Sequence, residues 1–92
     1  MNYIEKIKKE LDEELKMGED YTDLLDFYVL LVLVKGKECT NEDVHDAWSV
    51  WQNNIDEKHR SLIPFEDLTK EVQHLDAEYR DAIIRVSKQK DE

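Results

Sequence analysis

Eight side chains between residues 45 and 80 have the chemical properties of a ligand-binding site. The aromatic rings among them offer flat faces on which a planar group can stack. The cations among them could hold a phosphate, which binds to positive side chains or to exposed backbone amides. Two histidines could add hydrogen bonds to the same ligand. The candidate ligand-binding residues are His45, Trp48, Trp51, Lys58, His59, Arg60, Tyr79 and Arg80.

The two histidines of this set have open alternatives. His45 lies one position off an apolar helical stripe, so it is expected at the edge of the core. It could donate a hydrogen bond to a ligand, or it could pack against residues 58–65 and bond their backbone, as boundary histidines usually do. The same two interpretations apply equally to His59. His74 occupies a polar helical position and is expected at the surface.

Residues for catalysis or metal binding are not recognisable in this sequence. Cys39 is the one cysteine, and no histidine is placed by the sequence to activate it. Ser49 and Ser61 lack the glycines of a nucleophile elbow, and two glycines in the whole chain cannot build a phosphate-binding loop. The cysteine and the histidines also lack the short paired spacings of structural zinc sites. The sequence predicts no enzyme, no metal site and no cofactor.

A known family offers a possible context for the candidate site. The stretches that carry the resemblance are Val44-His45-Asp46-Ala47-Trp48, Lys58-His59, residues 62–68, Glu71 to Asp76, and Tyr79-Arg80. Together they resemble the repeat domain of ryanodine receptors, which also occurs in small bacterial and phage proteins. The resemblance covers roughly residues 42–86. This sequence lacks the glycine–tryptophan–glycine turn that members of this family commonly carry between the two histidine elements.

The resemblance implies a non-catalytic helical module that binds a nucleotide-derived small molecule. Trp48, Trp51 or Tyr79 would then stack on the base, and the basic residues would hold the phosphate. A free-standing protein of this type could sequester a cyclic ADP-ribose-type immune signal, which would make it a phage anti-defence protein. The alternative is an acidic protein-interaction module or inhibitor that resembles DNA in its charge and binds no small molecule.

Amphipathic segments that would position these residues recur along the chain. Asn2 and Thr40 are each followed three residues later by an acid, which predicts helix N-caps. Gly18 and Gly36 are expected to end the first two helices. The eight-residue apolar run 27–34 is compatible with a strand, but its polar lead-in has helical spacing and favours a helix. A third helix is expected to bury one stripe, formed by Val44, Ala47, Trp48, Trp51 and Ile55.

The sequence therefore predicts an all-α, single compact domain of four to five helices. Pro64 pushes Ile63 out of helical geometry, so an extended proline-containing segment is expected at about residues 58–68. Asp76 is expected to cap the last helix. The single domain is expected to span residues 1–92, divided into a helical pair at 1–38, the part resembling the ryanodine-receptor repeat at 39–88, and a mobile tail at 89–92.

The charge of the chain limits its partners. There are 23 acids and 13 bases, a formal net charge of −10, and residues 1–46 alone carry a net charge of −7. Such a surface repels phosphate backbones, so no nucleic-acid partner is expected. The longest apolar run is far shorter than a membrane span, so no membrane partner is expected either. One cysteine and no recognisable signal peptide favour a cytoplasmic protein. A homo-oligomer built on residues 27–34 is compatible both with the small-molecule-binding module and with the acidic protein-interaction module.

Overall fold

Helices are the regular secondary structure of the part that the computed structural model describes, residues 1–90. The short 3-10 helices are η1 (Glu19–Tyr21), η2 (Gly36–Glu38) and η3 (Phe65–Asp67). The prediction of an all-α fold is confirmed. No helix within the described residues is long and apolar enough to cross a membrane. The α-helices are α1 (Tyr3–Leu15), α2 (Thr22–Val34), α3 (Asn41–Ile55), the short α4 (Lys70–His74) and α5 (Ala77–Lys90).

Side-chain caps start α1 and α3 where the sequence predicts them. The Asn2 side chain accepts a hydrogen bond from the backbone N–H of Glu5 at 2.9 Å, which satisfies one free donor at the start of α1. Thr40 and Asp43 form a complete capping box at the start of α3, in which each side chain accepts from the backbone N–H of the other. These local bonds fix where α1 and α3 begin, because they depend only on residues within one turn.

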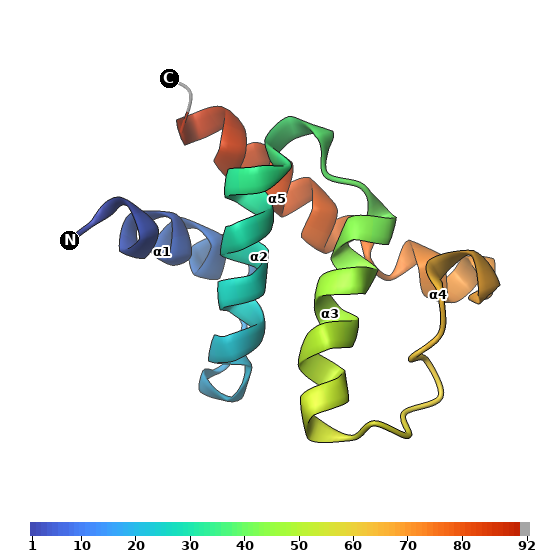
Figure 1. Cartoon of the computed structure of the whole chain (residues 1–92). Coiled ribbons are helices and arrows are strands. Elements are labelled where there is room, and N and C mark those ends of the chain that lie inside the picture. The colour runs from blue at the N-terminus through green and yellow to red at the C-terminus, as the bar shows by residue number, and fades with distance from the viewer. Residues whose placement is uncertain (91–92) are drawn as a thin grey trace.

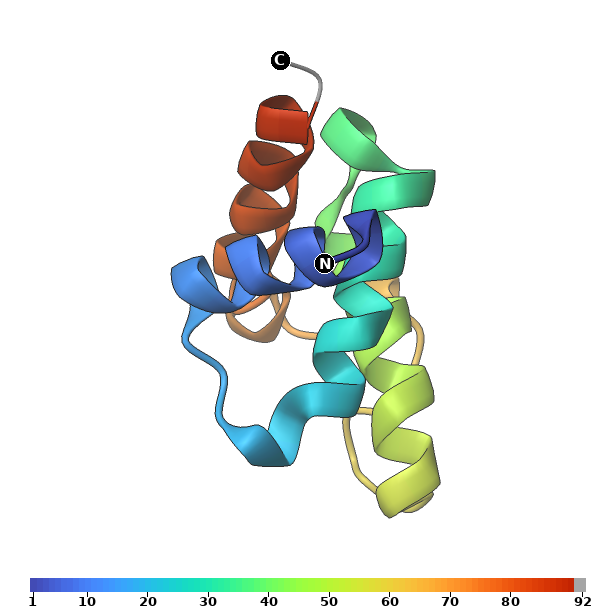
Figure 2. The same cartoon turned by 90° about the vertical axis from the view of Figure 1, so that its left-hand side faces the viewer.

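Helix α2 is central because it is apolar on almost every side. Figure 1 shows α2 between α1 and α3, with α5 running behind it, and Figure 2 shows α1 lying across α2 and α5. The core is made of buried residues from α1, α2, α3 and α5, together with Cys39 between η2 and α3. Ion pairs at the surface join α1 to its neighbours, Lys8 to Asp26 on α2 and Arg85 on α5 to Glu14. The largest buried side chains are Tyr28, Leu11, Ile83, Val32, Val44 and Val86.

The connection between α3 and α4 is the irregular part of the fold. It leaves the end of α3, runs outward and returns to α4, as Figure 1 shows in yellow and orange. Pro64 is extended, with a ψ of 146°, and η3 follows it directly. The side-chain amide of Gln73 donates to the backbone carbonyls of Phe65 at 2.9 Å and Leu68 at 3.2 Å, so α4 holds the end of this segment.

Several local details differ from the sequence-based predictions. Helix α1 ends at Leu15, and its C-cap Lys16 adopts the left-handed conformation at φ 51°, while Gly18 is extended instead of serving as the cap. Ile55, which was predicted to be part of the buried stripe of α3, is 62% exposed. The helical period identifies the face on which Ile55 lies but not how far a neighbouring element covers that face. The mobile tail predicted for residues 89–92 lies partly outside the described residues, and residues 89 and 90 are helical in α5.

Candidate small-molecule pocket

A cavity of about 540 Å³ opens between the end of α1, the inner faces of α2 and α3, and the α4–α5 junction. Its volume is within the range of small-molecule sites in proteins. Five of the eight predicted site residues line it: His45, Trp48, Trp51, His59 and Tyr79. The remaining lining residues are Leu15, Lys16, Met17, Gly18, Tyr21, Leu24, Tyr28, Ser61, Val72, Leu75 and Asp76.

Aromatic rings from five parts of the chain form much of the pocket wall. Tyr21 packs against Trp51 with ring centroids 5.7 Å apart, and Tyr28 packs against Tyr79 at 5.6 Å. Trp48 packs against two histidines, stacked on His45 at 5.7 Å and edge-on to His59 at 5.1 Å. Because each ring is held by another ring, the wall is positioned without a ligand.

His45 is a buried residue, only 3% exposed, that ties α3 to the irregular segment. Its Nε2 lies 2.8 Å from the backbone carbonyl of Ile63, so this nitrogen carries a proton and donates it. The Ser49 hydroxyl oxygen lies 3.3 Å from the same nitrogen. The contact with Ile63 is the backbone bond that the second interpretation of His45 expected. His45 nevertheless also lines the pocket, where Nδ1 has no hydrogen-bond partner among residues 1–90.

His59 is oriented by its own turn. Its Nδ1 accepts a hydrogen bond from the backbone N–H of Ser61 at 3.0 Å, while its backbone N–H donates to the carbonyl of Asp56 at 3.2 Å. Accepting at Nδ1 leaves the other ring nitrogen, Nε2, as the position for the proton. The half-buried imidazole therefore brings an N–H donor to the pocket wall, with its ring fixed against Trp48.

Asp76 is the acidic group of the pocket, and sequence analysis missed this role. It precedes α5 as a cap would, but its carboxyl makes no hydrogen bond or ion pair with any residue in the described range; only its backbone carbonyl accepts from Arg80. Burial raises the pKa of Asp76 to about 6, and the neighbouring His45 opposes that rise. A half-buried carboxyl with a raised pKa and no protein partner is typical of a functional site.

Two tyrosines lie within the electrostatic reach of Asp76. Burial raises the pKa of Tyr28 strongly, with further contributions from Tyr79 and Asp76. Burial also raises the pKa of Tyr79, followed by the charges of Glu78 and Asp76. Both phenols therefore stay protonated at neutral pH and can act as hydrogen-bond donors or as aromatic faces.

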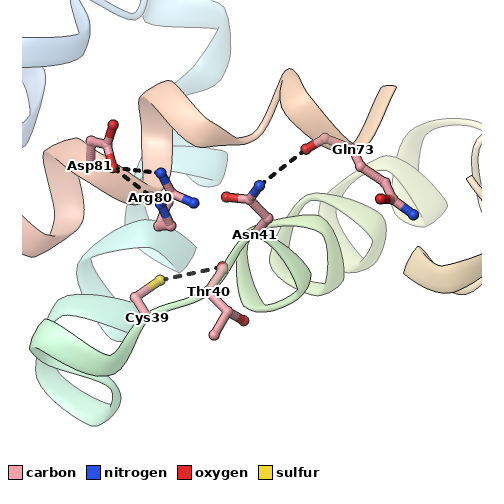
Figure 3. Close-up of polar contacts among 6 residues, drawn as sticks. All are labelled: Cys39, Thr40, Asn41, Gln73, Arg80 and Asp81. Atoms are coloured by element: carbon pink, nitrogen blue, oxygen red, sulfur yellow. Dashed lines mark hydrogen bonds and ion pairs between the residues drawn. The ribbon is translucent and has the colours of Figure 1, made fainter. Parts of the chain in front are cut away.

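The predicted phosphate-binding cluster does not assemble at this pocket. Lys58 and Arg60 are exposed, and neither lines the cavity. Arg80 pairs with Asp81 at 2.9 Å. Figure 3 shows its guanidinium beside Asp81 and Asn41, where Asn41 donates to the Gln73 carbonyl and so joins α3 to α4. The cation that does line the pocket is the exposed Lys16, which was not among the predicted site residues.

Two of the residues that sequence analysis missed, Tyr21 and Tyr28, come from segments far from the candidate motifs. Tyr21 and Tyr28 reach the pocket because α2 packs on α3 and α5, a tertiary contact that periodicity does not reveal. Asp76 did give a signal, an acid at a helix start, but that position is also the usual place of a capping residue. The cap interpretation concealed its place in the cavity.

No other chemistry gathers in the described residues. No group of three or more histidine, cysteine or acidic side chains in residues 1–90 is arranged to hold a metal ion. Cys39 is buried outside the pocket wall, where its thiol donates to the Thr40 carbonyl at 3.7 Å (Figure 3). Burial raises the pKa of this thiol to about 11, so it is not a thiolate at neutral pH.

Comparison with known proteins corrects the resemblance on which the nucleotide hypothesis was based. The family whose model matches is described as a domain of unknown function (DUF7701), and the match spans residues 2–88. The resemblance to ryanodine-receptor repeats is wrong. The short elements that suggested it are an aromatic helix face and a proline turn, which in this fold pack against each other through His45 and Ile63. No curated protein and no solved structure matches the chain. The match over nearly the whole chain shows that this protein belongs to the family described as a domain of unknown function, DUF7701.

Proposed function

We propose that this chain is a non-catalytic domain that binds a small organic molecule in the pocket between α1, α2, α3 and α5. The observation that carries the proposal is an aromatic cavity of about 540 Å³ whose wall includes a half-buried carboxyl without a protein partner. Mostly apolar walls with a few convergent polar groups are the usual composition of ligand sites. The polar groups here are Asp76, the free Nδ1 of His45 and the N–H of His59.

The wall favours a flat ligand over a highly phosphorylated one. Trp48, Trp51 and Tyr79 offer faces or edges to a planar ring, such as a nucleobase or another aromatic group. Among the described residues of the wall, a phosphate would have Lys16 as its one lysine or arginine partner and would meet the carboxyl of Asp76 in the same cavity. The ligand is therefore a planar small molecule that Lys58, Arg60 and Arg80 do not anchor.

The absence of an activated nucleophile in the described wall supports binding without catalysis. Ser61 is the only serine or threonine that lines the cavity, and its hydroxyl makes no hydrogen bond to a base among residues 1–90. Cys39 lies outside the cavity and holds its proton. The domain would then sequester its ligand or signal the binding to a partner, without converting the ligand chemically.

The experiment is a calorimetric screen of the purified chain against a panel of planar compounds. The panel contains nucleobases, nucleosides, adenosine nucleotides, cyclic ADP-ribose isomers, aromatic amines and aromatic acids. We expect at least one flat, weakly phosphorylated compound to bind, and His59→Gln to weaken that binding by about tenfold. His74→Gln is the matched control, because His74 is exposed on α4 and does not line the pocket. Failure of every compound to bind would contradict the proposal.

A second candidate function is an acidic protein-interaction module. The observation in its favour is the net charge of −10, most of it in residues 1–46. It predicts a complex with a basic protein that dissociates as salt rises, with no small molecule bound in the pocket. Pull-down at low and high salt, beside the calorimetric screen, separates the two candidates. Light scattering at two protein concentrations tests the homo-oligomer.

A further inference from the structure

The geometry points to a ligand that carries a positive charge, which forms an ion pair with the Asp76 carboxylate inside the aromatic wall. This inference rests on the proposed function and specifies the class of small molecule: a planar organic cation, such as a protonated aromatic amine. Nucleotides are negatively charged, so the ligand inferred from the structure has the opposite charge to the ligand first expected from the sequence.

The carboxyl of Asp76 has no partner in the described fold. Some other acids form ion pairs, such as Asp26 with Lys8 at 2.8 Å and Glu14 with Arg85 at 3.1 Å. Asp76 is half-buried, yet no side chain in residues 1–89 donates a hydrogen bond or an ion pair to it. A desolvated carboxylate without a counter-charge is costly, and a cationic ligand would recover that cost.

The wall around that carboxyl is aromatic. Tyr28 and Tyr79 pack on each other and line the same cavity as Asp76, and Trp48 and Trp51 line this cavity from α3. The face of an aromatic ring is negative, so it attracts an organic cation and gives nothing comparable to an anion. Carboxylate and aromatic rings therefore favour the same sign of ligand charge.

Competing positive charge at the pocket is weak. Among the residues whose side chains the structure describes, Lys16 is the one lysine or arginine in the wall, and it is exposed at the end of α1. Burial and His45 are the influences on the pKa of Asp76; Lys16 is not among them. The field of the whole chain, with a net charge of −10, attracts cations toward the cavity and repels anions.

The test compares three compounds that share one phenol ring and differ in charge: tyramine, tyrosol and 4-hydroxyphenylacetate. Calorimetry at pH 7.5 measures each Kd with the wild-type chain and with Asp76→Asn. We expect tyramine to bind about tenfold more tightly than uncharged tyrosol, with 4-hydroxyphenylacetate weakest. In Asp76→Asn the advantage of tyramine should fall to about twofold or less, with tyrosol unchanged. Glu78→Gln is the control, because it removes one negative charge from α5 without touching the pocket wall.

A pH series gives the inference a second readout. Burial raises the pKa of Asp76 to about 6, so tyramine binding should weaken about fivefold between pH 7.5 and pH 5 as the carboxyl gains its proton. The titratable groups that line the cavity with Asp76 are Tyr21, Tyr28 from α2, His45 from α3, Tyr79 from α5, His59 and Lys16. The raised pKa values of Tyr28 and Tyr79 keep both of these phenols protonated across this range. Asp76→Asn should remove most of this pH dependence.

The outcomes separate this inference from the proposed function. If an uncharged or anionic compound of the panel bound in the pocket more tightly than its cationic counterpart, the inference would be overturned and the proposed function would stand. Equal tyramine affinity in Asp76→Asn and the wild type would also overturn it. If no compound of either series bound, both proposals would fail.

Discussion

Two structural roles are open to the carboxyl of Asp76: it could cap α5, or it could form part of the pocket wall. Its sequence position, directly before α5, is that of an N-cap. Its side chain nevertheless accepts no hydrogen bond from the first turn of α5, and burial raises its pKa to about 6. A capping carboxylate would instead be stabilised in its charged form by the backbone donors. The raised pKa therefore reflects burial of the carboxyl without the backbone donors that a cap would have.

The pKa of Asp76 leads to a stability prediction with a definite sign. Its folded value of about 6 exceeds its ordinary value of 3.8, so the folded chain binds the proton more tightly than the unfolded chain. The stability that this group contributes is fully present below about pH 4 and is lost as the pH rises through about 6. We expect Asp76→Asn to raise the free energy of unfolding by about 1–2 kcal/mol at pH 7.5 and by almost nothing at pH 4. Urea denaturation at both pH values measures this.

The control for that measurement is Asp46→Asn, which removes an exposed carboxylate from α3. It should change the free energy of unfolding by about 0.5 kcal/mol or less at either pH. Equal stabilisation by Asp46→Asn and Asp76→Asn would mean that the effect comes from net charge. In that case the local desolvation of Asp76 would not be its cause.

His45 provides a second prediction at the scale of one residue. Its buried ring donates to the Ile63 carbonyl and packs between Trp48 and Phe65. His45→Ala removes this packing and leaves a carbonyl without its donor, so we expect a loss of about 2–4 kcal/mol in the free energy of unfolding. Thermal denaturation of His45→Ala and Ser49→Ala compares the two. Ser49→Ala should cost about 0.5 kcal/mol, and a similar cost for both would show that the Ile63 bond is unimportant.

The boundaries of the elements show what local sequence can determine. The caps at Asn2 and Thr40 and the end of α2 before Gly36 could be predicted, because each depends on bonds or backbone angles within a few residues. The end of α1 could not, since Lys16 adopts a left-handed conformation usually left to glycine. Likewise, the aromatic residues of α3 were predicted as site residues, whereas Tyr28 depended on how α2 packs. The apolar periodicity of one helix shows which face is buried, but it does not show which other helix covers that face.

The two glycines provide a matched test at the scale of these elements. Gly36 has a positive φ of 57°, and a Cβ there would meet the Ser87 Oγ at 2.9 Å. Gly18 is extended, and a Cβ there would meet nothing within 4 Å. We expect Gly36→Ala to lower the free energy of unfolding by about 1–3 kcal/mol, from backbone strain and the close contact with Ser87.

Gly18→Ala should be neutral or stabilise by about 0.5 kcal/mol, because it restricts the unfolded chain without strain in the fold. Chemical denaturation of both variants at one pH is sufficient. Equal effects would contradict the assignment of Gly36 as the turn that ends α2 against α5. Greater damage at Gly18 would mean that the turn between α1 and α2 is held more tightly than its open surroundings indicate.

The whole molecule carries far more negative charge than its ion pairs neutralise. The pairs of Lys8 with Asp26 and Arg85 with Glu14 involve partly exposed side chains, and such pairs contribute about 1 kcal/mol or less each. Repulsion among the acids of a chain with a net charge of −10 acts against the folded state. Screening of that repulsion should outweigh the weakening of the pairs.

We therefore expect the Tm to rise by about 3 °C when sodium chloride increases from about 20 to about 200 mM. Calorimetric melting at these two salt concentrations checks the prediction. Potassium chloride at the same ionic strength should give the same rise if screening is the cause. A Tm that falls with salt would mean that the surface ion pairs dominate the electrostatics of this fold.

The most direct test of the pocket is a nitrogen-15 NMR titration with the compound that binds best in calorimetry. The chain has two tryptophans, so Trp48 and Trp51 give two indole N–H signals, and both line the cavity. We predict that the ligand shifts both indole signals and the backbone amides of Asp76 and Tyr79, and that an excess of ligand saturates these shifts. Shifts confined to the outer faces of α1 and α2, or no shift at any concentration, would contradict the assignment of this cavity as the binding site.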